Sequence, residues 1–146
     1  MRSEFIDDKY LYAKCEPVIA GEEVGYIIET MRLALFAGRG VGLAANQVGF
    51  NKRIIMIHTQ DFKATIINPV VEPQKGGTIT SKEGCLSFPG KTAIVVRSRV
   101  VRLSGALPDG KPLGFKLAGM SAIIAQHECD HLEGLTCMDK ATKVYS

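Results

Sequence analysis

The stretch QHECDHLEG, residues Gln126–Gly134, holds two histidines four positions apart, with a glutamate directly after the first. On a helix, His127 and His131 would lie on one face, where both imidazoles can reach one metal ion. The pattern matches HExxH, in which the glutamate, here Glu128, takes a proton from a bound water. A short histidine-rich helix end also arises by chance, with its imidazoles satisfied by hydrogen bonds, so the motif alone leaves both interpretations open.

A stable metal site needs a third protein ligand. Downstream of the motif, Glu133 and Cys137 are the nearby candidates, and no histidine follows Gly134. The better candidate lies upstream in KEGCLSFPG, residues 82–90, where Cys85 ends an expected strand and can project from a sheet toward a packed helix. The alternative for this cysteine is a small buried thiol without a chemical role.

Length and composition predict one domain, residues 1–146, because 46% hydrophobic content is enough for one core. The net charge of +3 includes no basic run, so we expect neither nucleic-acid nor membrane binding. The charged N-terminus MRSEFIDDKY lacks the apolar centre of a secretory signal, which predicts a cytoplasmic location. Four cysteines without a CxxC pair indicate neither a disulfide framework nor a zinc ribbon.

The hydrophobic pattern predicts an α+β fold. EEVGYIIETMRLALFAG, residues 22–38, has the spacing of an amphipathic N-terminal helix that ends with Gly38 as its C-cap. Residues 53–58 and 64–71 read as short buried strands, and residues 92–119 as one long strand, a turn at Pro108-Asp109-Gly110 and a returning strand. Helical spacing returns in residues 119–134. Helix, antiparallel strands and helix in this order indicate the α+β class.

Three blocks together resemble the signature motifs of the peptide deformylases. They are GVGLAANQ (residues 40–47), EGCLS (residues 83–87) and QHECDH (residues 126–131), in the order and at separations similar to those of that family. The resemblance implies antiparallel sheets packed around a central metal-binding HExxH helix, in a single catalytic domain. It also implies that Cys85, His127 and His131 hold one divalent metal ion, Fe²⁺ in cells, which Zn²⁺, Ni²⁺ or Co²⁺ can replace.

The same resemblance implies a reaction, the removal of the formyl group from N-formylmethionyl peptides, with release of formate. Glu128 would be the general base, and the Gln47 amide and the Leu86 backbone N–H would hold the oxyanion. Val41 and Gly42 would pair with the peptide backbone, and glycines there keep bulk away from it. Ile123, with Met120 and Ile124, would line the pocket for the methionine side chain, although their spacing equally fits helix core.

The chain departs from the family pattern at two places. Thr92 stands where family members often carry an arginine that touches the substrate, and the neighbouring Lys91 is either a replacement charge or a solvated surface lysine. Arg97 matches a later family arginine and is expected to pair with Glu83. The chain also ends at Ser146, without the C-terminal helix that helps many bacterial deformylases dock on the ribosome. We therefore expect this protein to reach nascent chains in a different way.

Two other hypotheses account for part of the sequence. An HExxH peptidase with a non-standard third ligand would cleave internal amides and would give the Cys85 block no role. A catalytically silent fold would bind formylated peptides or keep the metal for stability alone. Glu128 argues against the silent fold, because a structural site needs no base beside an open coordination position.

Overall fold

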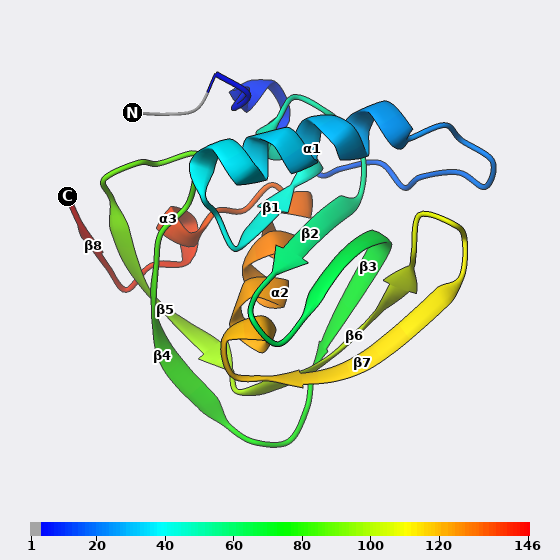
Figure 1. Ribbon diagram of the computed structural model, residues 1–146. Helices are drawn as coiled ribbons and strands as arrows, with labels where there is room; N and C mark the ends of the chain where they lie inside the picture. Colours follow the sequence, from blue (N-terminus) through cyan, green and yellow to red (C-terminus); the bar gives the residue numbers. More distant parts are fainter. Residues whose placement is uncertain (1–3) are drawn as a thin grey trace.

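The computed structural model describes residues 4–146, which form two antiparallel sheets and a small number of helices (Figure 1). In chain order the elements are η1 (Asp8–Tyr10, 3-10), α1 (Gly25–Gly38), β1 (Gly42–Ala44), η2 (Ala45–Gln47, 3-10), β2 (Ile54–His58), β3 (Lys63–Pro73), β4 (Thr78–Glu83), β5 (Thr92–Ser98), β6 (Val100–Ala106), β7 (Pro112–Ala118), α2 (Gly119–Leu132), α3 (Cys137–Lys140) and β8 (Lys143–Tyr145). The predicted α+β class with antiparallel sheets is confirmed.

The larger sheet has the strand order β1-β2-β3-β6-β7 and carries a helix on each face. Strand β2 is buried on both sides, because Ile55 and Ile57 pack into the cluster that contains α2, while Ile54 and Met56 pack into the cluster that contains α1. Successive side chains of a strand point to opposite faces, so this short apolar run separates the two layers of the core. Strand β1 is the free edge of this sheet.

The smaller sheet has the order β4-β5-β8, and α2 lies between it and the larger sheet (Figure 1). Apolar residues of α2, among them Ala122, Ala125 and Leu132, pack on the larger sheet. Polar residues on its other side reach β5. There the Gln126 Oε1 accepts a hydrogen bond from the Ser98 N–H, and the Gln126 Nε2 donates one to the Ser98 carbonyl, both at 2.9 Å. The HExxH segment therefore sits between the sheets, with its side chains held from two directions.

The predicted long strand from Thr92 onward is wrong. The structure divides it at Arg99 into β5, which pairs with β4 in the smaller sheet, and β6, which pairs with β3 and β7 in the larger one. The sequence gives no signal for this break, because neither glycine nor proline interrupts the β-branched residues between Thr92 and Leu103. Strand β4, of which sequence analysis expected only the end at Cys85 and not the range, is the partner that separates β5 from the larger sheet.

The predicted C-cap of the first helix is also shifted by one residue. Gly38 is the last helical residue, and Arg39 adopts the left-handed conformation that ends the helix, with φ of 53°. Glycine often adopts the left-handed conformation at a helix end, but Gly38 does not have that role here. Position 38 is instead limited by the packing of a neighbouring side chain. A Cβ on Gly38 would lie 2.6 Å from a methyl carbon of Leu86. Within residues 4–146, no helix is long and apolar enough to cross a membrane.

Candidate active site

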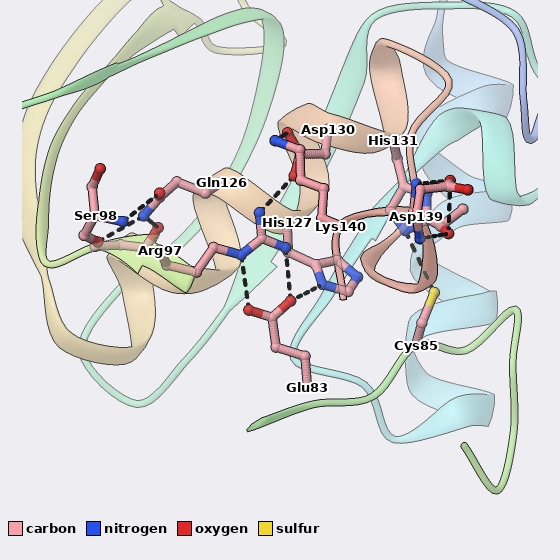
Figure 2. Close-up of polar contacts among 12 residues, drawn as sticks. Glu83, Cys85, Arg97, Ser98, Gln126, His127, Asp130, His131, Asp139 and Lys140 are labelled. Atoms are coloured by element: carbon pink, nitrogen blue, oxygen red, sulfur yellow. Dashed lines mark hydrogen bonds and ion pairs between the residues drawn. The ribbon is translucent and has the colours of Figure 1, made fainter. Parts of the chain in front are cut away.

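Three potential metal ligands converge where β4 ends against α2. Cys85 follows β4, His127 and His131 lie on α2, and one ligand atom from each lies within 4.8 Å of the others (Figure 2). The Cys85 Sγ is 3.4 Å from the His131 Nε2. Both histidines are buried, and Cys85 is half-buried. The sequence prediction that a thiol from mid-chain meets the two imidazoles agrees with this arrangement.

The spacing of these atoms fits a metal ion. Bond lengths of about 2.3 Å to sulfur and about 2.0–2.1 Å to nitrogen, at a tetrahedral angle, put the two ligand atoms roughly 3.5 Å apart. The observed separation between sulfur and Nε2 is 3.4 Å. Burial alone would lower the pKa of His127, but Glu128, Cys85 and Glu83 around it raise that pKa to about 10. The negatively charged groups around this imidazole therefore attract a cation to this place.

A second group of possible ligands, Glu83, His127 and Cys137, also lies within 4.8 Å. Its carboxylate is already used, because both oxygens of Glu83 accept hydrogen bonds from Arg97 and one also contacts the His127 Nδ1 at 2.8 Å. That contact leaves the Nε2 lone pair of His127 for a metal. A carboxylate that orients a ligand histidine through its other ring nitrogen is the usual supporting group of such sites.

The expected pairing of Arg97 with Glu83 is confirmed. The guanidinium of Arg97 donates through Nε and Nη2 to the two oxygens of Glu83, at 2.8 and 2.7 Å (Figure 2). It also pairs through Nη1 with Asp130, whose other oxygen accepts from Lys140 at 2.9 Å. Burial would raise the pKa of Glu83, but the hydrogen bonds from Arg97 and His127 hold it down at about 2. This ionised network connects β4, β5 and α2 behind the histidines.

Glu128 lies fully inside the protein beside the cluster. Burial raises its pKa to about 7, and its Oε1 has no hydrogen-bond partner among residues 4–146. A Cβ on Gly42 would lie 2.5 Å from the Glu128 Oε2 and 2.6 Å from a methyl carbon of Ile124. The glycine at position 42 is thus required by the approach of this carboxylate, a reason that sequence analysis did not identify.

Gln47 is held in one orientation by its two ends. Its Oε1 accepts from the Ala44 backbone N–H at 3.0 Å, and its Nε2 donates to the Ser87 Oγ at 3.1 Å and toward the Cys85 Sγ at 3.3 Å. The amide N–H groups therefore face the cluster. Leu86, the other predicted oxyanion donor, directly follows Cys85 in the chain. Its backbone N–H donates to no other described residue.

A cleft of about 420 Å³ opens beside these groups, and Gln47, Cys85, His127 and Glu128 all line it. Apolar residues of α2 form another part of its wall, namely Met120, Ile123 and Ile124. Ile123 is half-buried and Met120 is exposed, so both have surface to offer a ligand, whereas Ile124 belongs mainly to the core. The cleft thus places an apolar wall next to the polar groups that could act on a bound molecule.

The two residues predicted to pair with a peptide differ in what they can offer. The Val41 carbonyl already accepts from the His58 N–H at 2.7 Å. Backbone groups of successive strand residues point to opposite edges, so those of Gly42 face the free edge of β1. The backbone groups of Gly42 are therefore available at this edge, while Val41 exposes its side chain at the cleft.

Sequence analysis missed several supporting residues. Ser87 orients Gln47, and Asp130 holds the far end of Arg97. A Cβ on Gly40 would lie 3.0 Å from a methyl carbon of Leu86, so this glycine makes room for that side chain. The place of Ser87 as the last residue of the EGCLS block was the one available signal. The other contacts join residues more than 30 positions apart, which no local pattern reveals.

Three converging metal-ligand side chains and a buried carboxylate beside an open cleft are the groups of a metal-dependent hydrolase. A family model described as polypeptide deformylase matches residues 5–146. The chain belongs to this family. It removes the N-formyl group from the N-terminal formylmethionine of nascent peptides and releases formate.

Individual relatives agree with this assignment. The chain is 41% identical to peptide deformylase 1 of Corynebacterium glutamicum over 88% of this chain and 79% of the relative, and 37% identical to the peptide deformylase of Halothermothrix orenii over 95% and 92%. The solved structure of the deformylase from the Vibrio parahaemolyticus bacteriophage VP16T, in complex with actinonin, superposes with a TM-score of 0.85 at 40% identity. That match covers 93% of this chain and 99% of the phage protein.

Proposed function

We propose that residues 1–146 form a single catalytic domain in which Cys85, His127 and His131 hold one divalent cation. The convergence of these three ligand atoms within 4.8 Å is the observation that carries this proposal. The set leaves room for a fourth ligand, as in catalytic sites. When bound, the cation supplies a water of lowered pKa and polarises the formyl carbonyl. Formylated nascent chains are found where ribosomes make them, so the proposed place of action is the cytoplasm.

Glu128 is the proposed general base. Its partnerless Oε1 is free to accept a proton from the attacking water, and its raised pKa of about 7 lies near the pH at which proton transfer is efficient. After the formyl carbon has become tetrahedral, Glu128 returns the proton to the leaving amine. Burial matters here because a solvated carboxylate would be too weak a base to hold that proton.

Gln47 and Leu86 are the proposed oxyanion donors. The Gln47 Nε2 is fixed beside Cys85, and the Leu86 N–H directly follows this ligand in the chain. Donors placed in advance cost little reorganisation when negative charge develops on the formyl oxygen, and the Gln47 N–H that points toward the Cys85 Sγ is the one that would turn to it. Ile123 and Met120 would contact the methionine side chain, while the backbone of Gly42 pairs with that of the peptide along the free edge of β1.

A Gln47→Leu variant tests the oxyanion role. We expect kcat to fall about 10²- to 10³-fold with little change in KM, because the lost hydrogen bond strengthens only as the oxyanion forms. Steady-state kinetics measure both constants, and metal analysis checks that the site stays loaded. Loss of metal instead of kcat would assign Gln47 a role in holding the Cys85 thiolate.

The native metal is proposed to be Fe²⁺, with Zn²⁺, Ni²⁺ and Co²⁺ as substitutes, since one thiolate and two imidazoles suit all of these ions. In air, the Fe²⁺ form should lose activity faster than the Ni²⁺ form, because both iron and the half-buried Cys85 thiolate can be oxidised. Mass spectrometry should show added oxygen on the peptide that contains Cys85. Equal lifetimes, with this peptide unmodified, would count against Cys85 as a ligand.

One assay tests the proposed function as a whole. The metal-loaded protein is incubated with formyl-Met-Ala-Ser and with an acetylated peptide that offers only internal amides, and formate and new amines are measured. We expect formate from the first peptide and no cleavage of the second. Cleavage of internal amides would support the peptidase hypothesis, and no reaction with the metal in place would support the silent fold.

A further inference from the structure

The rim of the cleft carries three positive charges from three separate parts of the fold. Arg39 ends α1, Lys82 lies on β4 and Lys91 precedes β5, and all three are exposed and line the cleft. None of their side chains makes an ion pair or a hydrogen bond with another residue between positions 4 and 146. Elsewhere in this part of the chain, Arg32, Lys52 and Arg53 are each paired with a glutamate.

Among residues 4–146, no exposed carboxylate lines the mouth of the cleft to balance these charges. Among the residues that line the cleft, the acidic ones are Glu83 and Glu128, and both are buried. The charge of Glu83 is already compensated by Arg97, and the carboxylate of Glu128 lies in the interior against Gly42, away from the exposed rim. The rim therefore presents a net positive potential to a molecule that enters the cleft. Solvent screens charges less in a concave cleft than on a flat surface.

The substrate must cross this rim. The formyl group has to reach Glu128, and the methionine side chain has an apolar wall of α2 to lie against, so the rest of the peptide leaves toward solvent. In an extended peptide each residue advances about 3.3 Å, which brings the side chains of the second and third residues, directly after the methionine, to the mouth. These are the first positions whose side chains can meet Arg39, Lys82 or Lys91.

We propose that Arg39, Lys82 and Lys91 make the enzyme prefer formylmethionyl chains with acidic side chains at the second and third positions. This preference rests on the proposed function, since it assigns a substrate class to the same cleft. The rim also gives Lys91 a role beside Thr92, because the exposed lysine supplies a charge that the half-buried threonine cannot. The attraction acts on capture of the substrate, so its effect belongs in KM and in kcat/KM.

Matched peptides test this preference. We compare formyl-Met-Glu-Glu, formyl-Met-Gln-Gln and formyl-Met-Lys-Lys, all with C-terminal amides so that the terminal carboxylate cannot mimic an acidic side chain. We expect kcat/KM about fivefold higher for the Glu peptide than for its Gln isostere, and lower for the Lys peptide, from two exposed charge pairs. The ratio should shrink toward one as salt is raised, because the interacting charges are exposed.

Charge-reversed variants assign the effect to the rim. Arg39→Glu/Lys82→Glu/Lys91→Glu should reverse the order of the Glu and Lys peptides. The control Lys63→Glu/Lys75→Glu/Lys116→Glu changes the net charge by the same amount at exposed positions outside the cleft and should keep the order. Equal kcat/KM for the Glu and Gln peptides at low salt, or an unchanged order in the rim variant, would overturn the proposal. Absence of formate from every peptide would instead contradict the proposed function.

Discussion

Replacing Glu128 with glutamine should lower kcat for formylated peptides by about 10²- to 10⁴-fold, the range expected when a general base is lost. The amide has nearly the same shape as the carboxylate, so the narrow space between Glu128 and Gly42 stays filled. Glu128 is not among the three converging ligands, and metal content should therefore not change. Because burial already disfavours the charged form of this side chain, the neutral amide should leave the free energy of unfolding unchanged or higher.

The matched control for this variant is Glu133→Gln. Glu133 follows α2 directly and is exposed, and its carboxylate pairs with Arg53 and not with the cleft. Turnover should stay near the wild-type value in this control. If Glu128→Gln kept wild-type kcat at full metal content, another group would have to move the proton and the proposed mechanism would be wrong.

The second large effect is expected on stability. Replacing Arg97 with methionine should lower the free energy of unfolding by about 3–5 kcal/mol, because it leaves the buried carboxylate of Glu83 and the partly buried one of Asp130 without their shared cation. Glu83 would also no longer be held in the position from which it orients His127. The affinity for metal should therefore fall about 10- to 100-fold. Chemical denaturation and metal titration measure the two effects separately.

Two variants control for the loss of positive charge. Arg97→Lys keeps the charge but cannot reach both oxygens of Glu83 together with Asp130, and it should recover only part of the stability. Arg102→Met removes an exposed arginine from β6 and should change stability by less than about 0.5 kcal/mol. If Arg97→Met were as stable as Arg102→Met and kept its metal, the network would not support the site.

The same network predicts a dependence of stability on pH. The pKa of Glu83 is about 2 in the folded protein, against an ordinary value of 4.5. A depressed folded pKa stabilises the protein at pH values above the unfolded pKa, and this contribution is lost as the pH falls from about 4.5 to about 2. Denaturation curves across this window should show the loss in the wild type, and it should be smaller in Arg97→Met, where the pKa of Glu83 is less depressed.

The sequence was sufficient for those parts of the site that depend on local spacing. Two histidines at helical spacing with a glutamate between them mark α2, and glycine followed by cysteine marks the end of β4. The pairing of Arg97 with Glu83 could be inferred only through the resemblance to a family. Nothing local indicates that Asp130 holds the same arginine, because residues 97 and 130 meet through the packing of α2 against β5.

The errors in the fold have a related cause. Residues 92–103 read as one strand because β-branched residues run through them without a glycine or proline. The change of sheet at Arg99 depends on β4, whose TITSKE sequence is too polar to stand out as a strand. Sequence analysis expected Gly38 to cap the first helix and the glycines around position 42 to keep bulk away from a bound peptide. What approaches them, Leu86 and Glu128, comes from distant parts of the chain and becomes visible only in three dimensions.

The central claim is that one thiolate and two imidazoles bind the same cation. X-ray absorption spectroscopy of the Zn²⁺-loaded protein tests this claim most directly. We predict one sulfur neighbour at about 2.3 Å and two imidazole nitrogens at about 2.0–2.1 Å, with a light atom in the remaining position. Sulfur should disappear from the first shell in a Cys85→Asp variant. A wild-type spectrum with only nitrogen and oxygen neighbours would contradict the assignment of Cys85.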